Sequence, residues 1–105
     1  MSNRRRAELL RIATGLSAEL GTKVPLVFDK AYEELIHDPA VERPRSAMID
    51  DRAGIVYEIA TVSKILAPAL RIGYMIGPPS PLLEAVVQRT TFYLDSKFGV
   101  QSSEL

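Results

Sequence analysis

Three short groups of polar residues have the types and spacing that covalent chemistry on a bound ligand requires. They are Asp29 with Tyr32, then Thr61, Ser63 and Lys64, and finally Arg71. A lysine amine can hold an aldehyde as an imine, and an arginine with neighbouring hydroxyls can bind a phosphate group. The three groups are therefore candidates for one site that holds a phosphorylated aldehyde.

The residues before Thr61 predict an alternation of helices and strands, as in α/β proteins. Apolar residues at helical spacing over 9–20 predict a first helix, which Gly21 ends as a left-handed cap. Residues 24–28 predict a strand that is buried on both faces, because its apolar residues do not alternate with polar ones. Residues 30–36 predict a short helix, and residues 38–52 an irregular surface connection.

The second half of the chain continues the pattern. Residues 54–59 predict a second strand, residues 72–76 a third, and residues 61–70 the loop between them. Residues 82–93 predict an amphipathic helix with Ser80 as its N-cap. We expect an α/β fold of about three strands, the first two parallel and the third antiparallel, with flanking helices. Because ligands bind outside the carboxyl ends of parallel strands, the three polar groups are expected to meet at one edge.

The composition argues against several classes of protein, namely those that bind nucleic acid, membranes or metals. The 105 residues suffice for one small domain, and 13 basic side chains balance 13 acidic ones, which gives no reason to expect nucleic acid or a membrane as partner. The absence of cysteine excludes zinc–thiolate sites, and a single histidine argues against a histidine-rich metal site. No apolar run approaches the roughly 20 residues that span a bilayer, and no signal segment follows the arginines at 4–6. We expect a cytoplasmic protein without a bound metal.

The chemistry of pyridoxal 5'-phosphate (PLP) matches the three groups. Its aldehyde needs an amine, its pyridine nitrogen an anion that keeps the ring protonated, its phenolate oxygen a donor, and its phosphate a cation with hydroxyls. The residues that supply these, in that order, are Lys64, Asp29, Tyr32, and Arg71 with Thr61 and Ser63.

Two segments also resemble the signature motifs of a known family. Residues 29–32, Asp-Lys-Ala-Tyr, resemble the D-x-A-Y motif of fold-type-I PLP enzymes. Residues 61–74, TVSKILAPALRIGY, resemble their lysine segment, S/T-x-S-K followed by P-x-L-R-x-G-Y. Arginine at the seventh position after the lysine resembles the branch with kynurenine and 2-aminoadipate aminotransferases, and the aminotransferase-like domains of some winged-helix regulators share it. The resemblance extends from about residue 5 to residue 101.

The resemblance implies a role for each matching residue. Lys64 would form the Schiff base and shuttle a proton, Asp29 would pair with the pyridinium nitrogen, and Tyr32 would donate to the ring oxygen. The implied phosphate ligands are Thr61, Ser63 and Arg71. Lys30 stands where many relatives have an acidic residue, and no role is assigned to it.

As a whole, the resemblance implies a PLP-dependent aminotransferase, which moves an amino group between an amino acid and a 2-oxo acid within a homodimer. Residues 1–105 would form part of its large, cofactor-binding domain, with the N-terminal part and the small C-terminal domain absent. Residues 95–105 would reach the active site of the partner subunit. We therefore expect an internal fragment with little turnover of its own. Two alternatives stay open. One is a non-catalytic domain of a winged-helix transcription regulator that senses PLP or an effector, and the other is a truncated remnant without function.

Other residues have ordinary structural interpretations. The arginines at 4–6 are expected to be a solvated helix start, and His37 a helix-end histidine without chemistry. Tyr57 and Tyr74 are expected to pack on strands. The core is expected to include the apolar stripe of Leu82, Leu83, Val86 and Val87.

Overall fold

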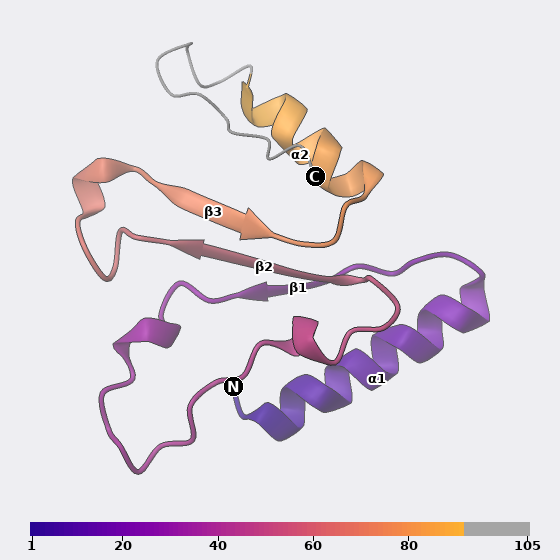
Figure 1. The fold of residues 1–105 in the computed structure, drawn as a ribbon, viewed down its shortest axis with the longest axis horizontal. Helices are drawn as coiled ribbons and strands as arrows, with labels where there is room; N and C mark the ends of the chain where they lie inside the picture. Colours follow the sequence, from indigo (N-terminus) through magenta and orange to yellow (C-terminus); the bar gives the residue numbers. More distant parts are fainter. Residues whose placement is uncertain (92–105) are drawn as a thin grey trace.

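A computed structural model of the chain describes residues 1–91 as a three-stranded sheet with two α-helices (Figure 1). The elements are α1 (Asn3–Leu20), β1 (Leu26–Asp29), β2 (Val56–Thr61), β3 (Gly73–Ile76) and α2 (Pro81–Thr91), with 3-10 turns η1 (Glu33–Leu35), η2 (Ala47–Ile49) and η3 (Pro68–Leu70). The strand order is β1-β2-β3, parallel between β1 and β2 and antiparallel between β2 and β3. The predicted α/β class and strand directions are confirmed. The predicted helix end at 92–93 and the tail at 95–105 lie outside the described residues.

Helix α1 forms one side of the core, to which it contributes Leu10 and Ala13. The hydroxyl of Ser2 accepts a hydrogen bond from the Arg5 amide at 3.3 Å, and Gly21 ends the helix in the left-handed conformation that was predicted. Leu10 and Ala13 are buried on the face of α1 that packs against β1 and η2. The helix therefore covers one side of the sheet only.

The core lies between α1 and the first two strands. Its buried residues are Leu10, Ala13, Phe28, Ala47, Ile55 and Val56. In β1 only Phe28 is buried, whereas Val27 is 48% exposed, so the prediction that residues 24–28 are buried on both faces is wrong. The reason is that β1 is an edge strand with a helix on one side only. The central strand β2 is instead buried at three successive residues, Val56, Tyr57 and Glu58.

One carboxylate organises the loop that leads into β2. Oδ1 of Asp51 accepts backbone hydrogen bonds from Ala53 at 3.1 Å and Gly54 at 2.9 Å, and Gly54 has φ 65°. Oδ2 accepts two more, at 2.7 Å each, from Ile55 and Val56. The irregular connection predicted for residues 38–52 is therefore followed by four successive amides, at residues 53–56, that are paired with a single side chain.

Helix α2 is linked to the sheet through a tyrosine. The hydroxyls of Tyr57 and Ser80 lie 2.7 Å apart, and Ser80 accepts a hydrogen bond from the Leu83 amide at 3.2 Å, which confirms the predicted N-cap. Tyr57 packs as predicted, being 4% exposed, but Tyr74 is 48% exposed. That difference follows from position, since Tyr74 lies on the outer strand β3.

The apolar stripe of α2 does not belong to the core. Its residues are exposed or half-buried: Leu82, Leu83, Val86 and Val87. Helix α2 lies beyond the outer strand β3, on the opposite side of the sheet from α1 in Figure 1. There the three-stranded sheet offers little surface to cover the helix, and the prediction from helical spacing alone is wrong.

The close packing of Gly77 against Tyr57 leads to a stability prediction. A Cβ atom at Gly77 would lie 2.2 Å from Cδ1 of the Tyr57 ring, which is held by its hydrogen bond to Ser80. We expect Gly77→Ala to lower the free energy of unfolding by about 1–3 kcal/mol, measured by urea denaturation. The matched control is Gly15→Ala in α1, where a Cβ meets nothing within 4 Å. That variant is expected to gain up to about 1 kcal/mol, and equal stabilities for the two variants would contradict the packing argument.

Candidate functional site

The carboxyl ends of β1 and β2 lie at the same edge of the sheet. Asp29 pairs in register with Ile59, and the Lys30 amide donates to the Ile59 carbonyl at 2.8 Å. Strand β3 begins at this edge, since Gly73 pairs with Thr61 (Figure 1). The structure thus brings the segments of all three predicted groups to one place.

Lys64 and Tyr32 come from different strand ends and lie together. The Lys64 Nζ is 5.7 Å from the centroid of the Tyr32 ring, and the ring is 63% exposed. Within the described residues the Lys64 ammonium has no hydrogen-bond or ion-pair partner. Asp29 accepts a hydrogen bond from the Ala31 amide through Oδ1 at 3.0 Å, which fixes the turn after β1, and its Oδ2 has no partner within residues 1–91. An amine, an aromatic ring and a carboxylate therefore flank this edge.

The loop after β2 holds the predicted phosphate ligands. Oγ1 of Thr61 lies 2.9 Å from Oγ of Ser63 and 3.0 Å from the Ile72 carbonyl, and it accepts a hydrogen bond from the Ser63 amide at 3.1 Å. Arg71, the residue before Ile72, has φ 52° and ψ 38°. This left-handed conformation costs a residue other than glycine roughly 1–2 kcal/mol, and strain of this kind is often found at ligand sites.

A cavity of about 580 Å³ lies next to this edge on the side of α1. Asp29 and Tyr32 line it together with Arg6, Leu9 and Phe28, whereas Lys64 does not. Its volume falls within the roughly 300–1,000 Å³ of typical small-molecule pockets. The candidate site therefore has a cavity beside Asp29, whereas Lys64 lies on the exposed surface outside this cavity.

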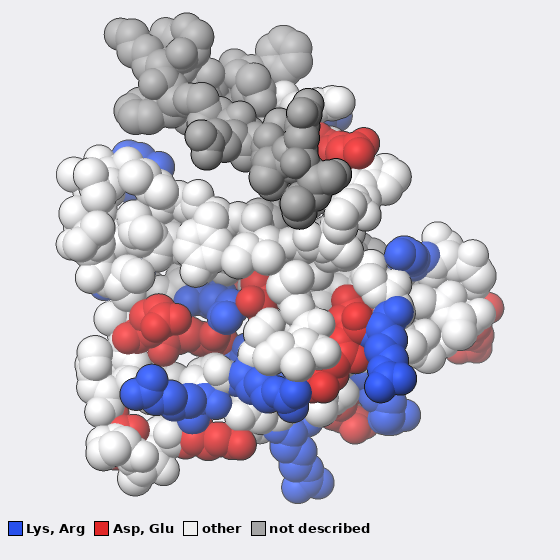
Figure 2. Space-filling model, in the orientation of Figure 1, with Lys and Arg blue, Asp and Glu red and all other residues white. Residues whose placement is uncertain are grey.

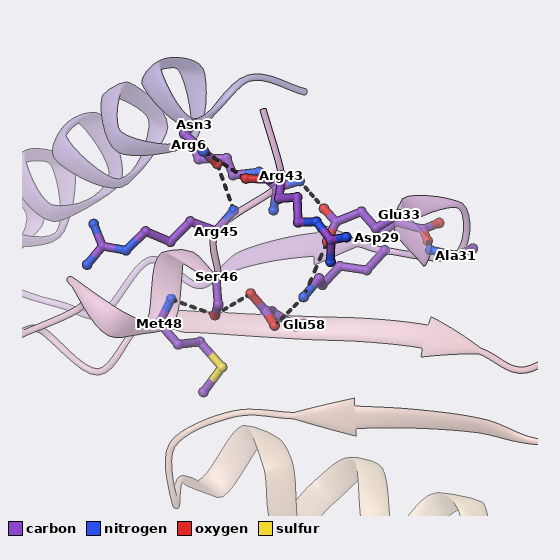
Figure 3. Close-up of polar contacts among 11 residues, drawn as sticks. Asn3, Arg6, Asp29, Ala31, Glu33, Arg43, Arg45, Ser46, Met48 and Glu58 are labelled. Carbon is purple, nitrogen blue, oxygen red and sulfur yellow. Dashed lines mark hydrogen bonds and ion pairs between the residues drawn. The ribbon is translucent and has the colours of Figure 1, made fainter. Parts of the chain in front are cut away.

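Four charged residues beside the candidate site form ion pairs that were not predicted from the sequence. This buried ion cluster consists of Arg6, Lys30, Glu33 and Glu58, and Figure 3 labels three of them, Arg6, Glu33 and Glu58. Arg6 pairs with Glu33, and the Lys30 Nζ lies 3.3 Å from Oε2 of Glu33 and 3.1 Å from Oε2 of Glu58. The Ser46 hydroxyl donates to Oε1 of Glu58 at 2.6 Å. The cluster joins α1, the turn after β1, β2 and the segment before η2.

The interpretation of residues 4–6 as a solvated helix start is wrong for Arg6. This residue is 4% exposed, and its guanidinium lies 5.5 Å from the centre of the Phe28 ring. Its Nε and Nη1 are buried and have no acceptor among residues 1–91. Helical spacing contained a signal for this, because Arg6 lies one turn before Leu10 on the same face. For Lys30 the sequence contained only a part of the signal, because Glu33 is three residues away but Glu58 is 28 residues away.

The rest of the described surface includes a second cavity of about 310 Å³, whose lining includes the charged residues Lys30, Glu33 and Arg43. On the face in Figure 2, basic and acidic side chains are interspersed over the lower half of the molecule and do not form a patch of one sign. His37 is exposed and follows the short turn η1, which replaces the helix predicted for residues 30–36. Within residues 1–91 no group of three or more metal-ligating side chains is found. No helix in this part of the chain is long and apolar enough to cross a membrane.

The chain is similar to two regulators of Bacillus subtilis (strain 168). It is 36% identical over 84 residues to the uncharacterized HTH-type transcriptional regulator YdfD and 31% identical over 84 residues to the uncharacterized HTH-type transcriptional regulator YisV. Each match covers 80% of this chain and 16% of the relative, so the chain spans about a sixth of the relatives' length. No family model matches the chain, and no solved structure matches it significantly.

These relatives overturn the expectation of an aminotransferase. Both are named as transcriptional regulators and neither as a transferase, so the enzyme class, the transamination of amino acids and the assignment to the kynurenine and 2-aminoadipate branch are wrong. The alternative of a regulator domain agrees better with the relatives. The motifs could not distinguish an aminotransferase from a regulator domain. The roles assigned to their residues are contacts to PLP, and an enzyme and a sensor can share such contacts.

Proposed function

We propose that this chain is part of the effector-sensing region of an HTH-type transcription regulator, and that its sheet edge binds PLP without turning over a substrate. The observation that carries the proposal is the position of the Lys64 Nζ, 5.7 Å from the centroid of the Tyr32 ring. The two residues follow different strands, β2 and β1, and the pairing of these strands brings their segments together. The names of the two relatives support the regulatory context.

The residues at this edge fit PLP by their chemistry. When bound, PLP supplies an aldehyde that bonds covalently to a lysine amine. Lys64 is exposed and has no hydrogen-bond or ion-pair partner within the described residues, so its amine is accessible. Asp29 keeps one carboxylate oxygen open for a ring nitrogen, and its other oxygen holds the turn in place. Tyr32 would present its hydroxyl to the ring oxygen.

The loop after β2 would bind the phosphate. The Ser63 hydroxyl lies 2.9 Å from the Thr61 hydroxyl, and its single proton can turn toward an anion. The backbone of Arg71 is held next to these hydroxyls, because the carbonyl of Ile72 accepts from the Val62 amide at 3.1 Å and lies 3.0 Å from the Thr61 hydroxyl. The exposed guanidinium of Arg71 would add the positive charge that a phosphate requires.

The openness of the edge supports sensing and argues against catalysis. Lys64 is exposed and Tyr32 is 63% exposed. Acceleration of a proton transfer depends on preorganised polar groups in a site from which water is excluded. A sensor needs only a ligand whose binding differs between two states of the protein.

The proposal is tested by reducing the chain with borohydride in the presence of PLP and mapping the label by mass spectrometry. We expect the label on Lys64. In Lys64→Ala the total label should fall at least about tenfold, the change that 1.4 kcal/mol of binding energy produces. The matched control is Lys23→Ala, an exposed lysine away from the edge, which should label as the unmodified chain does. Label spread equally over Lys23, Lys64 and Lys97 would refute the proposal.

A further inference from the structure

We propose that Lys30 is a positioning residue for the PLP site, and that the buried ion cluster holds the turn carrying Asp29 and Tyr32 in its binding geometry. The inference rests on the proposed function. It assigns a role to a residue outside the proposed ligand-binding set. It also explains why two buried residues, Arg6 and Glu58, and two half-buried ones, Lys30 and Glu33, form ion pairs beside an exposed site.

Lys30 ties the turn to the central strand at two points. Its amide donates to the Ile59 carbonyl at 2.8 Å, and its Nζ lies 3.1 Å from Oε2 of Glu58. Both partners, Ile59 and Glu58, are in β2, and the first two residues of this strand, Val56 and Tyr57, are buried. The start of the turn is therefore attached to the most buried strand of the sheet.

The end of the turn has a second attachment. Glu33 directly follows Tyr32 and pairs with Arg6 of α1 and with Lys30 (Figure 3). Ala31 and Tyr32 thus lie between two anchored residues, Lys30 and Glu33. Because the anchors lead to β2 and to α1, the turn cannot shift without breaking a buried ion pair.

Lys30 acts through the backbone, since its side chain and that of Asp29 lie in different surroundings. Successive side chains at the end of a strand point to opposite faces. The Lys30 side chain is 19% exposed and belongs to the buried ion cluster, whereas Asp29 is exposed. With two cations and two carboxylates the cluster is balanced in charge, and removal of one member leaves an unpaired buried charge.

The first test compares Lys30→Met and Lys30→Arg with the control Lys23→Met. We expect Lys30→Met to weaken PLP binding at Lys64 at least about tenfold and to shift the absorbance spectrum of the bound cofactor. Lys30→Arg should restore most of both, because it keeps the charge, and Lys23→Met should change neither. A Lys30→Met variant that is folded, less stable and unchanged in affinity and spectrum would show a purely structural role and overturn the proposal.

A double variant covers the case in which Lys30→Met does not fold. Lys30→Met with Glu58→Leu removes both charges of the pair, and such replacements often keep the fold. Its turn would still lack the Lys30 attachment, so we expect the same loss of affinity. Binding equal to that of the unmodified chain would overturn the proposal.

Hydrogen exchange without PLP separates this inference from the proposed function. Failure of the unmodified chain to take label at Lys64 would refute the PLP site alone. The positioning role is judged by amide exchange over residues 31–36, which we expect to be at least about tenfold faster in Lys30→Met than in Lys23→Met. Unchanged exchange over this segment would refute the attachment whether or not PLP binds.

Discussion

Replacement of Glu58 by leucine is expected to lower the free energy of unfolding by about 3–5 kcal/mol, the typical cost of removing one partner from a buried ion pair. Glu58 is 4% exposed and accepts hydrogen bonds from Lys30 at 3.1 Å and Ser46 at 2.6 Å. Without it the cluster keeps two cations, on Arg6 and Lys30, and only the carboxylate of Glu33. The remaining positive charge has little water to solvate it, so the folded state is destabilised.

Urea denaturation followed by circular dichroism measures this loss. The matched control is Glu34→Leu, since Glu34 is exposed and belongs to no ion pair of the described chain, and its stability is expected to change by no more than about 0.5 kcal/mol. The double variant Lys30→Met with Glu58→Leu should recover much of the loss, because no unpaired charge is left at that pair. Equal stabilities of Glu58→Leu and Glu34→Leu would show that the cluster does not stabilise the fold.

Replacement of Asp51 by alanine is the second large effect. Its carboxylate accepts from four backbone amides, and two of them belong to Ile55 and Val56, which are 1% and 0% exposed. A hydrogen bond to a charged group contributes about 1.5–3 kcal/mol, and an amide left unpaired in the interior costs about 1–3 kcal/mol. Because water can reach part of this loop, we expect a total loss of about 3 kcal/mol, seen as a lower midpoint of urea denaturation.

Two variants sharpen the interpretation of Asp51. Asp51→Asn keeps one acceptor oxygen, so we expect its loss to lie between those of the unmodified chain and Asp51→Ala. Asp50→Ala removes the neighbouring carboxylate, which is 57% exposed and whose ion-pair partner within residues 1–91 is the exposed Arg45. This variant should cost no more than about 1 kcal/mol. If Asp50→Ala and Asp51→Ala were equally stable, the four amides would not depend on Asp51.

The proposed PLP site and the buried ion cluster suggest how the proposed sensing function could use the turn after β1. Asp29 and Tyr32 face the candidate site, and the residues next to them in the chain, Lys30 and Glu33, reach β2 and α1. A ligand that restrains the turn would therefore act on the same segment that the helix holds. Such a ligand changes the protein only to the extent that it binds two of its states with different affinities.

Local features were predictable from the sequence because they depend on residues close together in the chain. Gly21 and Ser80 mark helix boundaries through contacts within a single turn. The three strands follow from short apolar runs. The polar groups after β1 and β2 could be expected at one edge, because parallel strands bring their carboxyl ends together.

The tertiary structure decided which side chains are buried, since burial depends on what covers each element. The spacing of Leu82 and Leu83 predicted a core helix, but α2 lies beyond the outer strand, where little surface meets it. Arg6 was expected at a solvated helix start, and Lys30 was given no role. Both lie in the cluster because packing brings Glu33 to Arg6 and Glu58 to Lys30 from 27 and 28 residues away. Opposite charges attract strongly only when the fold places them together away from water, and the order of residues along the chain does not contain that distance.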